Sequence, residues 1–168
     1  MKEIGLEEFK NNENYKKFIK YMLSKSEYFS LVYFRYRENE PMKKKTKDIS
    51  DLLKKLKVYS EYTLKWPGTE TRDTEHFYKI VFYRSEQEAE KALTMVDDIF
   101  DWYYPNAPMD LCFYRDGYCW YESTCHEGDA TVYTEDQKEI DDIKEMNANI
   151  IWCGDFGHTP FMLNKNKF

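Results

Sequence analysis

Hydrophobic and polar positions alternate with a period of two in several stretches of the chain, and this period predicts β-strands. The same stretches are rich in aromatic and β-branched residues, which pack well on a pleated sheet. The sequence Trp66-Pro67-Gly68-Thr69 is typical of a turn and ends the second strand. The predicted strands are Tyr28–Arg37, Lys57–Trp66, His76–Arg84, Ala130–Tyr133 and Asn149–Cys153.

Other stretches repeat their hydrophobic positions every three to four residues, which predicts amphipathic helices. Residues that can cap a helix N-terminus precede three of them: Asp48 or Ser50, Ser85 with Glu88, and Thr134 with Gln137. Four helices are predicted. The first begins near Leu6 or after Asn12 and ends at about Ser24. The others span Asp51–Leu56, Glu86–Tyr103 and Thr134 to about Asn147.

The clearest local signal is Asp116-Gly117, in the middle of the cysteine- and aromatic-rich stretch Met109–Gly128. Asp-Gly between β-prone residues is typical of a two-residue hairpin turn, in which both central residues need a positive φ. Phe113 and Trp120 would then form an aromatic pair facing the core. The predicted pairs are Arg115 with Tyr118, Tyr114 with Cys119, Phe113 with Trp120, and Cys112 with Tyr121.

This register also limits the chemistry of the cysteines. Cys112 and Cys119 share a face of the hairpin but are diagonal neighbours, about 7–8 Å apart between Cα atoms. An unstrained disulfide needs Cα atoms within about 7 Å, so we expect two separate thiols.

Helices inserted between strands, together with a tight hairpin, predict an α+β fold with a mainly antiparallel sheet. We expect about five to seven strands with three to four helices packed on the sheet. Residues 1–163 are predicted to form a single domain, followed by a flexible tail over 164–168 that is rich in Lys and Asn.

The composition favours an ordered chain in a reducing compartment. Apolar residues make up 42% and aromatic residues 18% of the 168 residues, too many for a disordered protein even with 33% charge. The N-terminus lacks the apolar segment of a secretory signal, and no apolar run is long enough to cross a membrane. Four cysteines in such a chain are expected to be reduced, and the location is expected to be cytoplasmic.

Charge is distributed unevenly along the chain. Residues 1–84 hold 19 Lys and Arg against 13 Asp and Glu, a net charge of +6, whereas residues 85–168 hold 6 against 18, a net charge of −12. Such an excess can steer a basic partner toward the protein. The candidate partner-binding residues are Asp97, Asp98, Asp101, Asp136, Glu139, Asp141, Asp142 and Glu145.

The basic residues between Lys43 and Lys57 could contact phosphate groups. However, the sequence pI is about 5.2 and the chain has no recognised nucleic-acid-binding module. A solvated basic loop is therefore the preferred interpretation, and a nucleic-acid partner is not expected.

Cys125-His126-Glu127 contains the groups of a nucleophilic site, a thiol beside an imidazole and a carboxylate. Adjacent residues of a strand point to opposite faces, so Cys125 would need His76 or His158 as its base instead of His126. Cys153 is the other candidate nucleophile. The alternative is that these cysteines have a structural role as ordinary core residues.

The sequence gives little support for a metal or cofactor. Its cysteines and histidines lack the short Cys-x₂₋₄-Cys spacing of structural zinc sites, and it has no Walker, Rossmann or HExxH motif. No metal site and no cofactor are expected.

Several short motifs resemble small bacterial single-domain proteins of unknown function, some of which are labelled as immunity-type or sporulation-type. The resemblance covers roughly residues 58–130, and Met109 departs from it where Glu or Pro would be expected. It implies a bacterial cytoplasmic protein and brings no catalytic residues. The matching motifs are Trp66-Pro67-Gly68-Thr69, Asp101-Trp102, Asp110-Leu111-Cys112-Phe113-Tyr114-Arg115, Trp120 and His126-Glu127.

Two functional hypotheses follow. The first is a binding protein without catalytic activity, of the immunity or antitoxin kind, whose acidic C-terminal half neutralises a basic effector. The alternative is a small thiol-dependent enzyme that uses Cys125 or Cys153 with a histidine.

Overall fold

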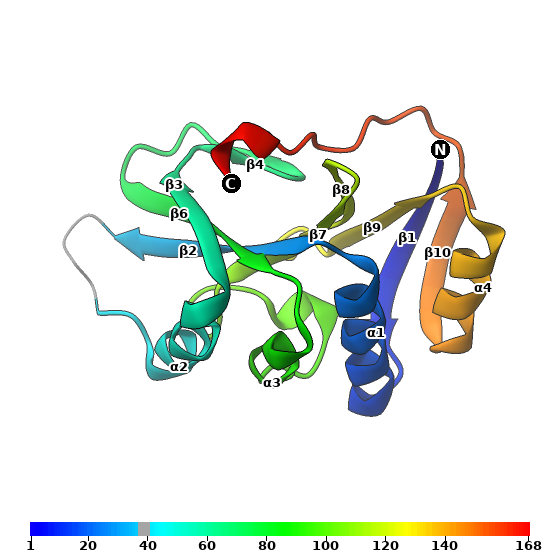
Figure 1. The fold of residues 1–168 in the computed structure, drawn as a ribbon, viewed down its shortest axis with the longest axis horizontal. Helices are drawn as coiled ribbons and strands as arrows, with labels where there is room; N and C mark the ends of the chain where they lie inside the picture. The colour runs from blue at the N-terminus through cyan, green and yellow to red at the C-terminus, as the bar shows by residue number, and fades with distance from the viewer. Residues whose placement is uncertain (37–40) are drawn as a thin grey trace.

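The computed structural model describes residues 1–36 and 41–168, and its main feature is one antiparallel sheet of eight strands (Figure 1). The order of strands across the sheet is β10-β1-β9-β8-β7-β2-β6-β3. A separate hairpin pairs β4 (Lys65–Trp66) with β5 (Thr69–Glu70). The strands of the large sheet are β1 (Lys2–Phe9), β2 (Tyr28–Tyr36), β3 (Lys57–Tyr62), β6 (His76–Arg84), β7 (Met109–Arg115), β8 (Tyr118–Thr124), β9 (Asp129–Thr134) and β10 (Ala148–Gly154).

The α+β class is therefore confirmed, while the expected count of five to seven strands was too low. The additional strand is β1, in a stretch where a helix starting near Leu6 was one of the two predictions. Ile4 and Leu6 are fully buried at alternating positions, as a strand between β9 and β10 requires. The predicted end of β2 at Arg37 lies outside the described residues.

The α-helices cover one face of the sheet, which we call the helix face (Figure 1). No described helix is both long and apolar enough to cross a membrane. The helices are α1 (Asn12–Lys25), α2 (Lys44–Leu53), α3 (Glu90–Leu93) and α4 (Gln137–Glu145), and the 3₁₀ turns are η1 (Lys54–Leu56), η2 (Gln87–Ala89), η3 (Ile99–Asp101) and η4 (Lys165–Lys167).

The long helix predicted over Glu86–Tyr103 was wrong, because the segment folds into η2, the single-turn α3 and η3. Most of its predicted hydrophobic stripe still faces the core, but Tyr103, the last residue of that stripe, is 48% exposed. The chain turns at Asp98, whose carboxylate accepts hydrogen bonds from Ile99 N–H (2.6 Å) and from Phe9 N–H of β1 (2.9 Å). An Asp side chain that binds backbone N–H groups favours a turn over helix continuation. The buried stripe residues are Ala89, Ala92, Leu93, Val96 and Ile99.

Two other helix starts differ from the prediction. Helix α2 begins at Lys44, well before Asp51, and no side chain caps it. Helix α4 is capped by Asp136, which accepts a hydrogen bond from Lys138 N–H (2.8 Å). Thr134, the predicted cap, instead accepts a hydrogen bond from Asp136 N–H (3.0 Å), so the sequence located α4 but not its cap.

The central hairpin has the predicted turn, and the pairs Arg115–Tyr118 and Tyr114–Cys119 are confirmed. Beyond them the predicted register was wrong. A β-bulge places Phe113 opposite Tyr121, with Trp120 as the extra residue. Both Trp120 and Tyr121 are consequently buried in the core on the helix face.

The opposite face of the sheet carries a second core, which the C-terminal segment 155–168 covers as it runs back from β10 (Figure 1). We call this segment the C-terminal strap and the surface beneath it the strap face. Leu163 is buried there, and the Phe168 ring lies 4.9 Å from the Tyr28 ring and 5.2 Å from the Phe82 ring, between centroids. Phe168 belongs to the segment predicted as a flexible tail over 164–168, and these contacts place its ring against the strap face.

Candidate functional site

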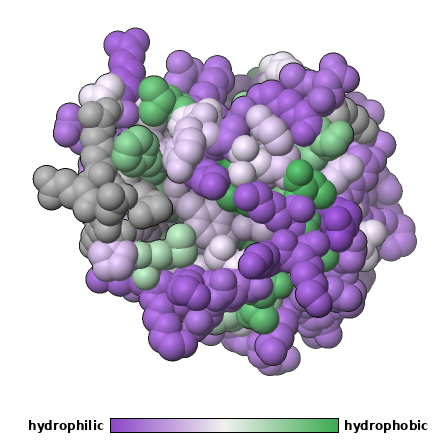
Figure 2. Space-filling model, turned by 60° about the vertical axis from the view of Figure 1, so that its left-hand side comes forward, coloured by the Kyte–Doolittle hydropathy of each residue, from purple (hydrophilic) through white to green (hydrophobic). Residues whose placement is uncertain are grey.

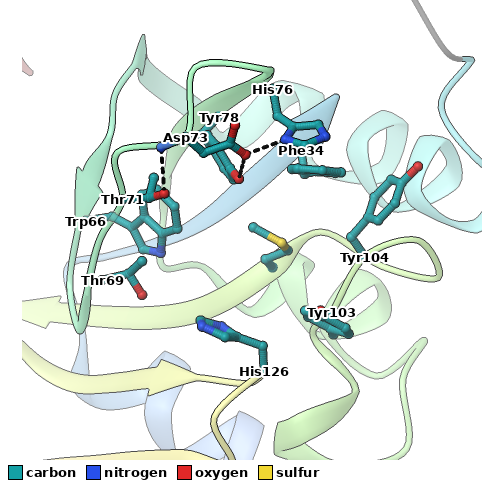
Figure 3. Close-up of a pocket in the computed structure, with 11 residues that line it drawn as sticks. Phe34, Trp66, Thr69, Thr71, Asp73, His76, Tyr78, Tyr103, Tyr104 and His126 are labelled. Atoms are coloured by element: carbon teal, nitrogen blue, oxygen red, sulfur yellow. Dashed lines mark hydrogen bonds and ion pairs between the residues drawn. The ribbon is translucent and has the colours of Figure 1, made fainter. Parts of the chain in front are cut away.

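A cavity of about 280 Å³ lies on the strap face, where side chains from the ends of β2 and β6 meet the β4–β5 hairpin and the β8–β9 turn (Figure 3). We call it the aspartate pocket. None of the described residues that line it is Lys or Arg. These lining residues are Phe34, Trp66, Thr69, Thr71, Asp73, His76, Tyr78, Tyr103, Tyr104, Met109 and His126.

The β4–β5 hairpin forms one wall, and a glycine holds it close to the sheet. Gly68 has a φ of +72°, and a Cβ atom at this position would collide with Thr124 Oγ1 at the end of β8. Only glycine satisfies both the backbone conformation and the close approach. The turn signal at Pro67-Gly68 therefore positions the adjacent Trp66 and Thr69 at the pocket.

Beneath this wall lies the buried carboxylate of Asp110, which is 1% exposed and has a φ of +53°. Its Oδ2 accepts a hydrogen bond from Trp66 Nε1 (2.8 Å), and its Oδ1 accepts one from Cys125 N–H (2.9 Å). Burial raises the pKa of Asp110, and both hydrogen bonds partly offset this effect. Asp110 thus fixes the indole of Trp66 and the start of the β8–β9 turn at once.

Asp73 supplies the pocket with an accessible carboxylate. Its Oδ2 accepts hydrogen bonds from His76 Nδ1 and from Tyr78 Oη (2.7 Å), while its Oδ1 accepts one from Glu75 N–H (2.8 Å) (Figure 3). The hydrogen bond from His76, then that from Tyr78, lowers the pKa of Asp73 to about 2. Asp73 is therefore ionised at any physiological pH.

Aromatic rings form the rest of the pocket. Phe34 lies 4.4 Å from Tyr104 and 4.8 Å from His76, measured between ring centroids. Tyr103 stacks on His126 at 6.3 Å with an interplanar angle of 22°. The hydroxyl oxygen of Thr69 is buried and has no hydrogen-bond partner among the described residues. A ligand with an N–H group could use this oxygen as an acceptor.

The structure separates Cys125 from His126 and Glu127 of the Cys125-His126-Glu127 motif. Cys125 is buried, and its Sγ lies 3.3 Å from the carbonyl oxygen of Ile99 on the helix face. Burial, then the nearby Asp110, raises the pKa of the Cys125 thiol to about 12, which is unsuitable for a thiolate nucleophile. His126 faces the aspartate pocket instead, and its Nε2 is 3.6 Å from Glu127 Oε1.

The other thiol combination is separated by the sheet itself. Cys153 is exposed on β10 opposite Ile4, so it shares the face of that buried residue. His158 binds Glu3, the neighbour of Ile4, through Nδ1 at 2.6 Å, and Glu3 points to the other face. All four cysteines are free. No three His, Cys, Asp or Glu side chains within the described residues are grouped to hold a metal ion.

Several acidic residues proposed for partner binding have structural contacts. Glu139 is 5% exposed and binds Arg115 in a bidentate pair at 2.6 and 2.8 Å, which lowers the pKa of Glu139. Asp98 and Asp101 accept backbone hydrogen bonds around η3, and Asp136 caps α4. Asp97 contacts the side chain of Asn12, Asp141 contacts Gln137, and Asp142 contacts Lys138. Glu145 is exposed.

Sequence reasoning found His76 and His126 as isolated candidates, but it missed the aspartate pocket as a site. Asp73 belongs to a loop between strands, and nothing in its local sequence distinguishes it from other polar loop residues. The available signal was the alternation along β6, which gives His76 and Tyr78 one face of the sheet.

Neither a family model, nor a curated protein, nor a solved structure matches this chain. The resemblance to small bacterial proteins of the immunity type therefore stays a prediction. The function has to be argued from the pocket itself.

Proposed function

We propose that this protein is a binding protein without catalytic activity, and that the aspartate pocket receives a cationic group of a basic partner. The observation that carries this proposal is the composition of the pocket: a carboxylate held ionised by its hydrogen bonds, surrounded by aromatic rings, with no Lys or Arg among the described lining residues. Ammonium and guanidinium groups bind favourably over aromatic faces, most strongly over Trp.

Two further contacts support a cation. The buried carboxylate of Asp110 accepts the Trp66 Nε1 hydrogen bond, which polarises the indole and favours a cation at its face. The hydroxyl of Thr69, which has no hydrogen-bond partner among the described residues, can accept a hydrogen bond from an ammonium or guanidinium N–H. A Lys or Arg side chain of a protein partner has both properties, a charge and N–H donors.

The acidic helix α4 would support this function by attracting the partner, whereas the charge distribution in the sequence suggested that the acidic half binds it. Helix α4 lies beside β10, which is one edge strand of the sheet. The pocket lies beside β2 and β6, toward the other edge (Figure 1). The charge of α4 can raise the rate of encounter with a basic partner without contacting that partner directly. An immunity or antitoxin-like protein that neutralises a basic effector would combine these two elements.

The test is a titration with butylammonium and butylguanidinium, which carry the end groups of Lys and Arg, and with neutral pentanol. Binding is followed by the NMR signal of the Trp66 indole N–H, which reports on the pocket wall directly. We expect both cations to shift this signal and pentanol to shift it far less. Equal binding of pentanol, or no shift with either cation, would overturn the proposal.

Matched variants locate the binding. Asp73→Asn should weaken butylammonium binding about two- to fivefold, the usual range for an accessible ion pair, and Tyr103→Ala should weaken it by a similar factor through a lost cation–π contact. Asp141→Asn on α4 is the control, because it removes an equal charge far from the pocket. If Asp141→Asn weakens binding as much as Asp73→Asn, the cation is attracted by general acidity and the pocket assignment fails.

A further inference from the structure

A second cavity, of about 390 Å³, lies on the helix face of the same strands β2 and β6. Alternation along β6 assigns its side chains to the two cavities: His76 and Tyr78 line the aspartate pocket, and Phe77 and Lys79 line this one. Helix α2 and η1 form its other wall. We call it the lysine pocket.

Three lysines from three elements converge there: Lys54 of η1, Lys57 of β3 and Lys79 of β6. None of them forms an ion pair with a carboxylate among the described residues. The one acidic lining residue, Asp51, has its carboxylate 2.7 Å from Lys47 Nζ. The cavity therefore keeps an excess of positive charge.

Two exposed aromatic rings stand beside these lysines. Tyr62 is 65% exposed and Phe77 is 44% exposed, and their ring centroids are 5.9 Å apart in an edge-to-face arrangement. Lys79 Nζ lies 5.6 Å from the centroid of the Tyr62 ring. Exposed rings of this kind are stacking surfaces for planar ligands, and the nearby ammonium groups favour a ligand that also carries negative charge.

The floor of the lysine pocket is polar but uncharged. Tyr33 and Tyr83 share a hydrogen bond of 2.8 Å between their hydroxyl groups. The face of the molecule in Figure 2 is mostly hydrophilic, with separate small hydrophobic patches. The site is thus a cationic hollow with aromatic sides.

We propose that the lysine pocket binds a nucleotide, with the base stacked on Tyr62 or Phe77 and the phosphate held by the lysines. A phosphate monoester carries about −1.5 to −2 charges at neutral pH, which matches a cluster of three ammonium groups. The volume falls within the range of small-ligand sites, about 300–1,000 Å³. A free nucleotide and a nucleotide within a single strand of RNA share this chemistry.

The proposal revises the interpretation of the basic segment Lys43–Lys57. Sequence reasoning treated it as a solvated loop, because the acidic pI and missing modules argued against nucleic acid. Folding separates its lysines: Lys44 and Lys47 pair with acidic residues of α2, while Lys54 and Lys57 meet Lys79 at the cavity.

The test uses four probes in NMR titrations of the full chain: AMP, adenosine, inorganic phosphate and a single-stranded octamer of adenylate RNA. AMP should bind at least about tenfold more tightly than adenosine or phosphate, since charge-assisted hydrogen bonds and stacking each contribute more than 1 kcal/mol. Tighter binding of the octamer than of AMP would assign the site to single-stranded RNA, and equal or weaker binding would assign it to free nucleotides.

Controls compare residues of the same type inside and outside the cavity. Lys79→Gln should weaken AMP binding at least about fivefold through the lost charged contact, and Tyr62→Ala should do the same through lost stacking. Lys45→Gln removes an exposed charge of α2 that does not line the cavity, and Tyr103→Ala removes a ring of the aspartate pocket. If either control weakens AMP binding as much as its counterpart, or if adenosine binds as tightly as AMP, the proposal is overturned.

Discussion

The aspartate pocket and the lysine pocket occupy opposite faces of the same two strands, yet they differ in charge. Both are lined by aromatic side chains that β2 and β6 supply in alternation. Phe34 and Tyr78 face the aspartate pocket, while Tyr33 and Phe77 face the lysine pocket. The strands themselves therefore provide similar apolar surfaces on both sides.

The charged and polar residues come largely from neighbouring elements. Asp73 and His126 belong to connections between strands, whereas Lys54 and Lys57 come from η1 and the start of β3. Lys79 is the exception, since β6 itself carries it. One aromatic strand thus lines two cavities, and the elements around it decide the charge of each cavity.

The floors of the two pockets also differ in charge. A buried carboxylate, Asp110, supports the aspartate pocket through Trp66, and a neutral tyrosine pair supports the lysine pocket. Hydrogen bonds to charged groups are about twice as strong as neutral ones. The aspartate pocket should therefore depend more on a single side chain.

The largest expected effect is that of Asp110→Asn, because this residue serves two buried donors. Asn tolerates the positive φ as Asp does, but it keeps one acceptor oxygen and turns its amide group toward the other donor. We expect a loss of about 2–4 kcal/mol in the free energy of unfolding, from a charged hydrogen bond replaced by an unpaired buried donor. Urea unfolding measures it, and a loss below about 1 kcal/mol would contradict the supporting role of Asp110.

A smaller effect is expected at the floor of the lysine pocket, and it should be asymmetric. Ser50 lines the same cavity as Tyr33 and offers its hydroxyl an alternative partner, while Tyr83 has Tyr33 as its hydroxyl partner among the described residues. Tyr33→Phe leaves the buried Tyr83 hydroxyl unpaired and should cost about 1–3 kcal/mol, whereas Tyr83→Phe should cost about 0.5–1.5 kcal/mol. Equal losses in urea unfolding of the two variants would show that Ser50 does not compensate.

Most of this architecture could be predicted from periodicity, because a strand reveals its faces locally. The alternation in His76–Arg84 predicted β6 and, with it, which residues share a face. The failed helix over Glu86–Tyr103 shows the limit of the same reasoning. Most of its stripe is buried as expected, but Tyr103 is exposed, and Asp98 binds Phe9 N–H of β1, a partner that lies far away in the sequence.

The sites were harder to predict because each depends on such distant contacts. Cys125 and His126 attracted attention as neighbours, yet the fold sends the thiol into the core and the imidazole into a pocket with Asp73. The basic segment was equally misleading, since Lys79 joins it only after β6 pairs with β3. Local sequence carries the residue types, and tertiary pairing decides which of them act together.

The contribution of the accessible Asp73 to stability should depend on pH. The folded-state pKa of Asp73 is lowered to about 2, below the usual value for Asp of about 3.9. Its contribution to stability is therefore fully present above about pH 4 and is lost as pH falls toward 2. The difference in unfolding midpoint between the wild type and Asp73→Asn should narrow over this interval.

Thermal unfolding from pH 5 to pH 2 measures this difference. Burial is the main reason that the pKa of Asp98 is raised to about 6, so the contribution of Asp98 to stability is lost as pH rises. The wild type and the variant both contain Asp98, so its effect cancels in the difference. A difference that stays constant down to pH 2 would mean that His76 and Tyr78 do not hold Asp73 in its ionised form.

The smallest expected effect on stability is that of Lys79→Gln, and its value lies in separating binding from folding. Lys79 lies over the exposed ring of Tyr62 and has no carboxylate partner within the described residues, so little native interaction is lost. The free energy of unfolding should change by less than about 0.5 kcal/mol, as is usual for surface substitutions. If the three ammonium groups repel one another across the cavity, the free energy of unfolding should rise, and more so at low salt. Urea unfolding at two salt concentrations measures both points. A clear loss of stability would mean that Lys79 supports the fold, and the charge of the lysine pocket would then need no ligand to explain it.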